Sequence, residues 1–301
     1  MSVEEEREQS NLQKEHPLKG DGRTLFYPEA HLYVHDGLLV RTSVTAVLKK
    51  YWPEFDAEGV VDSNFAQWRG SRNHKYHPLI RYLELVQLRD HAFCKEAVRL
   101  LWEAEAERAS EEGTRMHHHF QCMVERWPLP DGETAEVRTF RRWLANFCTR
   151  YDLSVWRSEW IVVHEEQGVA VVAGQIDLLL KSNSSNSYWA VDYKRTNPAP
   201  KYAGGPRNLL GAQMTSFEGG SGPFKELRAT DFNKYTSQLN AYAYIAHANY
   251  GVDFRDRMFL VQIHPDLPEA HCVQVRRMDE EMQHVFGAEV QDALLEARRS
   301  P

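Results

Sequence analysis

The sequence has no long hydrophobic run and little cysteine. None of its 301 residues belongs to an apolar stretch of about 18, so no membrane-spanning helix and no membrane partner are expected. Its acidic start, MSVEEEREQS, is unlike a secretion signal and unlike an arginine-rich mitochondrial presequence. We therefore expect a soluble, intracellular protein.

The few cysteines are too widely spaced to form a metal-binding ribbon. They are Cys94, Cys122, Cys148 and Cys272. No CxxC pair occurs, which argues against a zinc ribbon and against a cysteine-bound iron–sulfur cluster. Without a secretion signal, we expect them to be reduced thiols of the core.

Positive charge is also in short supply. Lysine and arginine total 36 against 43 aspartates and glutamates, and the net charge of −7 excludes a protein that coats nucleic acid by bulk charge. It does not exclude a protein that binds DNA along one basic groove. The 42% hydrophobic and 26% charged residues are typical of a globular chain with a sizeable core.

Three parts are predicted along the chain. Residues 1–22 are polar and predict a disordered lead, and residues 23–152 predict a mostly helical N-terminal lobe. That lobe includes a long helical stretch over 93–127, interrupted at Gly113. From residue 153 to 301 the pattern predicts an α/β core.

The core should contain a mixed central β-sheet flanked by helices. Its predicted strands are rich in β-branched and aromatic residues and cover 154–164, 168–181, 188–195, 256–264 and 270–277. Helices are predicted over 230–250 and 279–298, and a long glycine-rich loop over 196–229.

Two aspartates and a lysine form the most informative pattern. Asp192 and Lys194 are two residues apart on a predicted strand, so their side chains project from the same face. If the preceding hairpin turns between Ser184 and Ser185, facing residues have numbers that sum to 369, and Asp177 then lies opposite Asp192. The same register places Lys194 beside Gln175.

Facing carboxylates repel each other unless a cation lies between them. Carboxylates and water suit Mg²⁺ or Mn²⁺, and a neighbouring lysine can stabilise negative charge on a phosphate, so the pattern favours metal-assisted hydrolysis. The alternative is a structural role, with both aspartates in salt bridges to Lys194 and Arg195.

These residues resemble the catalytic signature of the PD-(D/E)XK nuclease superfamily, Gly174-x-Ile176-Asp177 followed by Asp192-x-Lys194. Further segments are similar to motifs of its RecB-like exonuclease branch and occur in the expected order: Gly113-Thr114-x-x-His117, Ser158-Glu159 and Gln238-x-x-x-Tyr242. Ser43-Val44-Thr45 resembles the opening of mitochondrial genome-maintenance exonucleases and related viral or phage nucleases. The resemblance implies a restriction-endonuclease-like core.

It also implies roles for the strand residues. Asp177 and Asp192 would bind the metal, with the main chain of Val191 as a further ligand. Lys194 would act on the attacking water or on the transition-state charge. Glu159 would join the metal site, although it can equally be a charged strand residue beside Arg157.

On the helices, the resemblance implies that His117 is a further metal ligand or a phosphate contact. Gln238 would orient the substrate or the lysine, and Tyr242 lies one turn further on the same helix face. Thr114 and Arg195 are candidate substrate contacts. The branch often has a glutamate four residues after the histidine, where this chain has Gln121.

Two basic segments are candidates for binding DNA. The segment from residue 68 to 77 mixes aromatic and basic side chains, which stack on bases and pair with phosphates, or it is an ordinary solvated loop. Its candidate residues are Trp68, Arg69, Arg72, Lys75 and Tyr76. Arg138 and Arg142 share one face of a predicted helix and suit a backbone phosphate, or form a solvated face.

The sequence therefore predicts a Mg²⁺- or Mn²⁺-dependent deoxyribonuclease, an exonuclease on single-stranded DNA in replication, repair or recombination. Cluster-free members of the branch are the better comparison, because only Cys272 lies near the C-terminus. Two alternatives stay open: a structure- or sequence-selective endonuclease on the same fold, and a catalytically idle nucleic-acid-binding module. The direction of digestion, the choice between DNA and RNA, and protein partners are not encoded in these motifs.

Overall fold

The computed structural model describes residues 10–18, 20–28, 30–86, 90–196 and 219–297. They fall into two compact units, a core unit within 1–53 and 116–301 and a helical unit within 54–115. The long helix α5 (His91–Glu125) contributes to both and runs without a break through Gly113, contrary to the predicted interruption. The predicted lobe boundary at residue 152 is wrong, because residues 23–53 and 116–152 pack with the sheet.

The core unit is a mixed α/β fold built on a sheet of parallel and antiparallel strands, as predicted. The strand order is β4-β6-β7-β8-β9, and β5 pairs along the other edge of β6. The strands are β4 (Thr42–Ser43), β5 (Leu153–Glu166), β6 (Val169–Ser182), β7 (Tyr188–Lys194), β8 (Met258–Gln262) and β9 (His271–Gln274).

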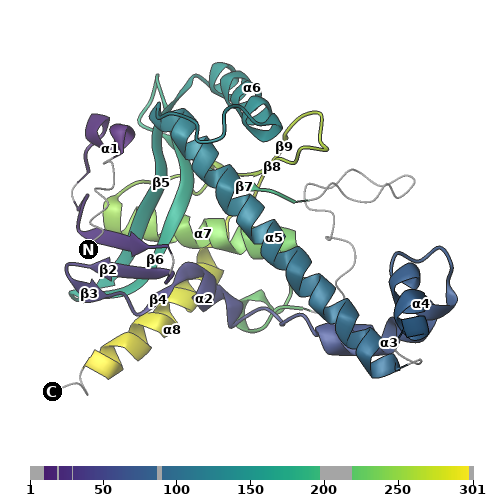
Figure 1. Ribbon diagram of the computed structural model, residues 1–301. Helices are drawn as coiled ribbons and strands as arrows, with labels where there is room; N and C mark the ends of the chain where they lie inside the picture. Colours follow the sequence, from purple (N-terminus) through teal and green to yellow (C-terminus); the bar gives the residue numbers. More distant parts are fainter. Residues whose placement is uncertain (1–9, 19, 29, 87–89, 197–218, 298–301) are drawn as a thin grey trace, which may run out of the picture. The chain divides into compact units, whose positions relative to one another are not determined.

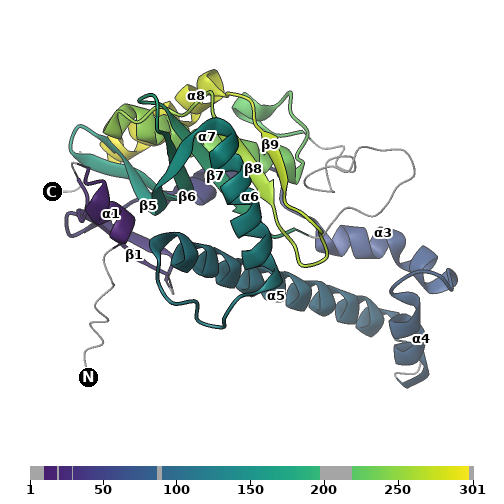
Figure 2. The same cartoon turned by 90° about the horizontal axis from the view of Figure 1, so that it is seen from above.

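Helices cover both faces of this sheet (Figures 1 and 2). On one face, apolar side chains of α2, α7 and α8 pack on the strands, and on the other those of α1, α6 and the C-terminal turns of α5. The helices are α1 (Asn11–Glu15), α2 (Val44–Lys49), α6 (Ala135–Tyr151), α7 (Asp231–Tyr250) and α8 (Asp279–Ala297). A short 3₁₀ turn, η2, follows Ser221.

The strand β6 has two successive neighbours along one edge, which creates a fork. Parallel β4 pairs with Val172 and Ala173, and antiparallel β7 pairs from Leu178 onward. Residues 174–177 lie between the two ladders, while β7 continues alongside β8 to Lys194. Along this edge of β6, residues 174–177 have no main-chain ladder partner, so side chains occupy the space between the strands.

The segment predicted as a disordered lead is partly ordered. Residues 1–9 lie outside the described residues, but residues 11–15 form α1 and bury Leu12. Arg157, which is 2% exposed, anchors the following turn through an ion pair with Asp21 at 2.8 Å. The segment around α1 is ordered because it contacts a buried carboxylate, Glu125, at the end of α5.

Glu125 is fully buried and accepts three hydrogen bonds, from Ser10 Oγ at 2.6 Å, Ser158 Oγ at 2.5 Å and Leu12 N at 3.0 Å. Glu125→Ala should lower the free energy of unfolding by about 2–4 kcal/mol, because it leaves these donors unsatisfied. Ser10→Ala removes one donor to Glu125 and the N-cap acceptor for Gln13 N, and should cost about 1 kcal/mol. Urea denaturation of both variants measures the difference, and equal losses would contradict this role.

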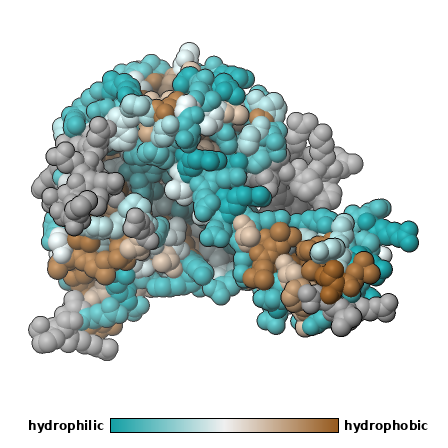
Figure 3. Space-filling view, in the orientation of Figure 1, coloured by the Kyte–Doolittle hydropathy of each residue, from teal (hydrophilic) through white to brown (hydrophobic). Residues whose placement is uncertain are grey.

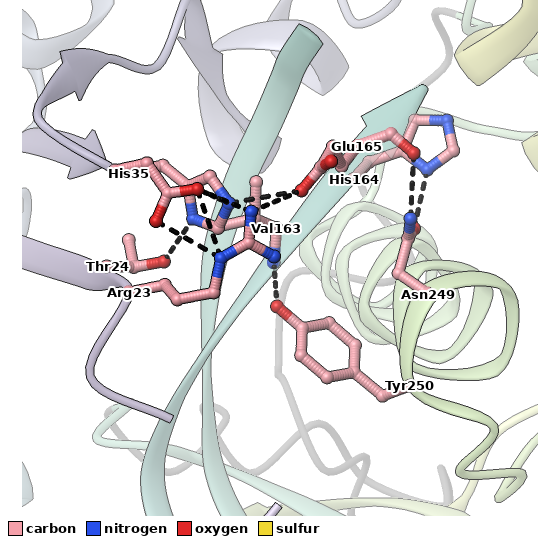
Figure 4. Close-up of polar contacts among 9 residues, drawn as sticks. Arg23, Thr24, His35, Val163, His164, Glu165, Asn249 and Tyr250 are labelled. Carbon is pink, nitrogen blue, oxygen red and sulfur yellow. Dashed lines mark hydrogen bonds and ion pairs between the residues drawn. The ribbon is translucent and has the colours of Figure 1, made fainter. Parts of the chain in front are cut away.

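A small meander before β4 is fastened to the sheet by polar contacts (Figure 4). It comprises β1 (Thr24–Tyr27), β2 (Leu32–His35) and β3 (Leu38–Leu39), with the predicted turn at residues 36–37. Glu165 accepts from Arg23 at 3.1 Å and lies 3.2 Å from His35 Nε2. Tyr250 OH accepts from Val163 N at 2.9 Å, so α7 is tied to the same end of β5.

The helical unit has its own aromatic core. It contains α3 (Ala57–Gly70), α4 (His77–Val86) and the N-terminal part of α5. Val61, Phe65 and Ile80 are buried there. Hydrophobic residues also show on its surface in Figure 3, in keeping with the exposure of Leu85 and Val86 on α4. Within the described ranges, no helix of either unit has the length and apolarity needed to cross a membrane.

Candidate metal centre

Three side chains from different elements meet beside the fork. His117 comes from α5, Glu159 from β5 and Asp177 from β6, and one ligand atom of each lies within 4.8 Å of the others. His117 Nδ1 is 3.5 Å from Glu159 Oε1 and 3.5 Å from Asp177 Oδ1. All three belong to the core unit, and sequence analysis had selected all three.

The backbone of Glu159 is unusual for a strand. Its φ of 45° lies in the left-handed region, which costs a non-glycine residue on the order of 1 kcal/mol or more. The flanking residues pair normally, Ser158 with Leu178 and Trp160 with Ile176, so Glu159 lies opposite Asp177 without a ladder partner. Strained positions of this kind cluster at functional sites.

The predicted register of the β6–β7 hairpin is confirmed. Leu178 pairs with Val191 and Lys181 with Tyr188, and both sums equal 369. The ladder stops one pair before Asp177 and Asp192. There the amide of Tyr193 donates to Asp177 Oδ2 at 2.8 Å, so the carboxylate replaces a main-chain partner in the fork.

Lys194 is held by three groups. Its Nζ lies 2.7 Å from Asp192 Oδ2, donates to Gln238 Oε1 at 3.3 Å, and lies 4.5 Å from the centre of the Tyr235 ring. Gln238 in turn donates to the hydroxyl of Tyr242 at 2.8 Å. The glutamine and tyrosine of the helix motif thus position the lysine, one of the two roles expected for Gln238.

Gly174 makes room for this arrangement. A Cβ atom at that position would lie 2.5 Å from Cε1 of Tyr242 and 3.0 Å from Val44 Cγ2. The glycine of the Gly174-x-Ile176-Asp177 segment is therefore required for close packing of α7 and α2 on β6.

Burial and charge shift the ionisation of the site strongly. Burial raises the pKa of Asp177, and it raises that of Asp192 to about 6 even though Lys194 opposes the shift. Burial lowers the pKa of His117, but the charges of Asp177 and Glu159 outweigh it and raise the value to about 9. Burial also lowers the pKa of Lys194, yet Asp192 and Asp177 leave it raised, so the ammonium stays charged.

The donor set fits a divalent cation. Two donors bound to one ion at about 2.1 Å are separated by roughly 3–4 Å, which matches both 3.5 Å distances from His117. Glu159 Oε1 is buried and makes no hydrogen bond within the described structure. A protonated His117 supplies the positive charge between the carboxylates, and a metal ion that replaces its proton would do the same.

The metal-ligand role predicted for Asp192 stays a prediction. Among the described residues, the group with metal-ligand spacing consists of His117, Glu159 and Asp177, whereas Asp192 pairs with Lys194. Val191 is buried between its partners Leu178 and Phe259, and its proposed main-chain ligation stays a prediction. The expected Lys194–Gln175 contact is wrong, because the strands part there and Gln175 donates to the carbonyl of Glu159 at 3.3 Å.

The residues predicted to contact substrate near the metal-binding group lie in different environments. Arg195 forms an ion pair with Glu136 at 3.3 Å, which places it at the start of α6. Arg138 and Arg142 are exposed on α6. Thr114 belongs to the helical unit, and its hydroxyl donates to the carbonyl of Ser110 at 3.0 Å.

The aromatic residues predicted to stack on bases are part of the helical unit's core instead. Trp68 is 8% and Tyr76 is 6% exposed, and Trp102 Nε1 donates to the Tyr76 hydroxyl. Trp68 belongs to α3, so the loop is shorter than predicted. Of the basic residues of this segment, Arg69 pairs with Glu84, Lys75 lies 4.5 Å from the Tyr76 ring centre, and Arg72 is exposed.

Sequence reasoning missed Tyr235. It precedes Gln238 by three residues on α7 and therefore shares its face. That spacing was available from the sequence. What the sequence could not show is that Lys194 reaches across to the ring, since that depends on how α7 packs on the sheet.

Comparison of the sequence with models of known protein families and with curated proteins finds no match.

Proposed function

We propose that this chain is a Mg²⁺- or Mn²⁺-dependent nuclease that hydrolyses phosphodiester bonds of single-stranded DNA. The observation that carries the proposal is the His117–Glu159–Asp177 group beside the buried Asp192–Lys194 pair. Such a group can hold a divalent cation, and the lysine can meet the phosphate. The RecB-like motifs support the same conclusion, and the preference for DNA ends rests on them alone.

The donor set also bears on the metal. A divalent ion bound here supplies Lewis-acid polarisation of the phosphate and a more acidic water. Two carboxylates suit Mg²⁺ and Mn²⁺ alike, but an imidazole suits transition metals better than Mg²⁺. Mn²⁺ should therefore support cleavage at a lower concentration than Mg²⁺.

The protein's own residues have separable tasks. Lys194 keeps its positive charge and donates to the negatively charged phosphate, where charge develops in the transition state. Asp192 and Gln238 hold that ammonium in place, and Tyr242 holds Gln238. Asp177 and Glu159 are the oxygen donors, and the Tyr193 amide fixes the orientation of Asp177.

The deciding experiment compares linear and circular single-stranded DNA of equal sequence. We expect degradation of the linear form with Mg²⁺ or Mn²⁺, survival of the circle, and no cleavage in EDTA. Cleavage of both forms at equal rates would point to an endonuclease. Cleavage that persists in EDTA, or no cleavage with either metal, would overturn the proposal.

A further inference from the structure

A cavity of the core unit lies beside α6 and is lined by none of the residues of the metal-binding group. It has a volume of about 600 Å³ and is bounded by α6, β8 and the turn before β9, which lie side by side in Figures 1 and 2. Its walls combine aromatic rings with charged and amide groups: Arg142, Trp143, Asn146, Arg150, Phe259 and Glu269. A cavity of this size and mixed lining is typical of a small-ligand site.

The two arginines leave unbalanced positive charge at the cavity. Arg142, Asn146 and Arg150 are four residues apart and form one row along α6. In the part of the chain that the structure describes, Arg142 has no ion pair, and Arg150 lies 5.5 Å from the ring of Tyr151 rather than beside a carboxylate. By contrast, the adjacent Arg141 is paired with Glu133. One exposed carboxylate, Glu269, opposes the two guanidinium groups.

The same row leads toward the metal centre. Arg138 is exposed and precedes Arg142 by one turn, with its guanidinium donating to the carbonyl of Glu133 at 3.0 Å. At the start of α6, Glu136 pairs with Arg195, the residue after Lys194. From Glu136 to Asn146 the helix rises about 15 Å, a distance that a few nucleotides of single strand span.

We propose that this cavity binds an unpaired nucleotide of single-stranded DNA, a few nucleotides away from the bond that is cut. The inference rests on the proposed nuclease function. Guanidinium groups pair with backbone phosphates, and aromatic rings such as Trp143 and Phe259 offer apolar contact to a base. The amide of Asn146 can donate and accept at a base edge. The site thus fixes the strand while Lys194 and the metal-binding group act on the phosphate.

Binding in EDTA tests the site without cleavage. A set of fluorescent single-stranded oligonucleotides carries one abasic nucleotide, moved stepwise along the strand, and binding is measured by anisotropy. We expect affinity to fall about 5-fold or more when the abasic nucleotide occupies one particular position, and little elsewhere. Affinity that does not depend on the abasic position would overturn the proposal.

Arginine variants connect that effect to the cavity. Arg142→Ala and Arg150→Ala should each weaken binding by about 3- to 10-fold, lower the salt dependence, and reduce the abasic effect. The matched control is Arg141→Ala, one residue along the same helix, which should bind as the unaltered protein does. Equal losses in all three variants would contradict a defined site. Because Trp143 also packs on Phe140, the test uses the exposed arginines rather than the tryptophan.

The two proposals fail separately. If the unaltered protein does not cleave DNA with either metal but still shows the position-dependent abasic effect, the nuclease assignment is refuted and the nucleotide-binding site is supported. Metal-dependent cleavage without any abasic effect would support the nuclease assignment and refute the nucleotide-binding site. Tight binding of free deoxynucleoside monophosphate that Arg142→Ala abolishes, with no strand binding, would also overturn the strand-binding proposal.

Discussion

Asp177→Asn is expected to abolish metal-dependent cleavage, by on the order of a thousandfold or more, without weakening the fold. The amide oxygen can still accept from Tyr193 N, which preserves the fork. Burial raises the pKa of Asp177, so the protein is most stable below the usual aspartate range, where this carboxyl is protonated, and loses stability as the pH rises and the carboxyl ionises. An uncharged asparagine avoids that loss. Metal-free thermal denaturation should therefore give an equal or higher Tm than for the unaltered chain.

Metal addition separates this effect from simple stabilisation. Mg²⁺ or Mn²⁺ at about 100 times its Kd should stabilise the unaltered protein by roughly 3 kcal/mol, and the Asp177→Asn variant far less. The matched control is Glu125→Gln, another buried carboxylate, which should lower the Tm but keep the metal response and the activity. A variant at Asp177 that retains cleavage, or that still responds fully to metal, would refute the proposed centre.

Only part of the geometry of the His117–Glu159–Asp177 group could be predicted from the sequence. The strands and the register of their hairpin follow from alternation and turn residues, which act locally. His117 and Glu159 could be placed only by resemblance, since α5 and β5 approach β6 through long-range packing. The pairing of Asp192 with Lys194 agrees with one of the two alternatives drawn from the sequence, because residues two apart on a strand project from the same face.

The error at Trp68 and Tyr76 has a related cause. A segment rich in aromatic and basic residues fits both a base-stacking loop and a small helical core, and periodicity over so short a span does not separate them. Arg69 is an example of a residue that fits both interpretations. It is half-exposed and looks available for phosphate, but it is the partner of the buried Glu84. Likewise, the short helix α1 escaped prediction because its stability comes from Glu125, more than 100 positions away.

Lys194→Met should lower the rate of cleavage by about 100- to 10,000-fold, because the side chain keeps its apolar length but loses the only role that the site gives it, a fixed positive charge. Asp192 and Asp177 raise the pKa of Lys194, so the ammonium remains protonated through neutral pH and cannot take a proton from water. Its contribution is to stabilise charge on the phosphate. Single-turnover kinetics with saturating Mn²⁺ measure the chemical step directly.

The variants that surround Lys194 test the assignment of its role. Tyr235→Phe keeps the aromatic ring 4.5 Å from the ammonium and should stay near full activity, whereas Tyr235→Leu removes the ring face and should slow the chemical step about 5- to 30-fold without changing DNA binding in EDTA. Gln238→Leu breaks the hydrogen bond to Lys194 and the one to Tyr242, and a similar loss is expected. The order of effects is therefore Lys194→Met first, then Gln238→Leu and Tyr235→Leu, then Tyr235→Phe. Full activity of Lys194→Met would show that the phosphate is stabilised without the lysine, and the site would then need a different catalytic cation.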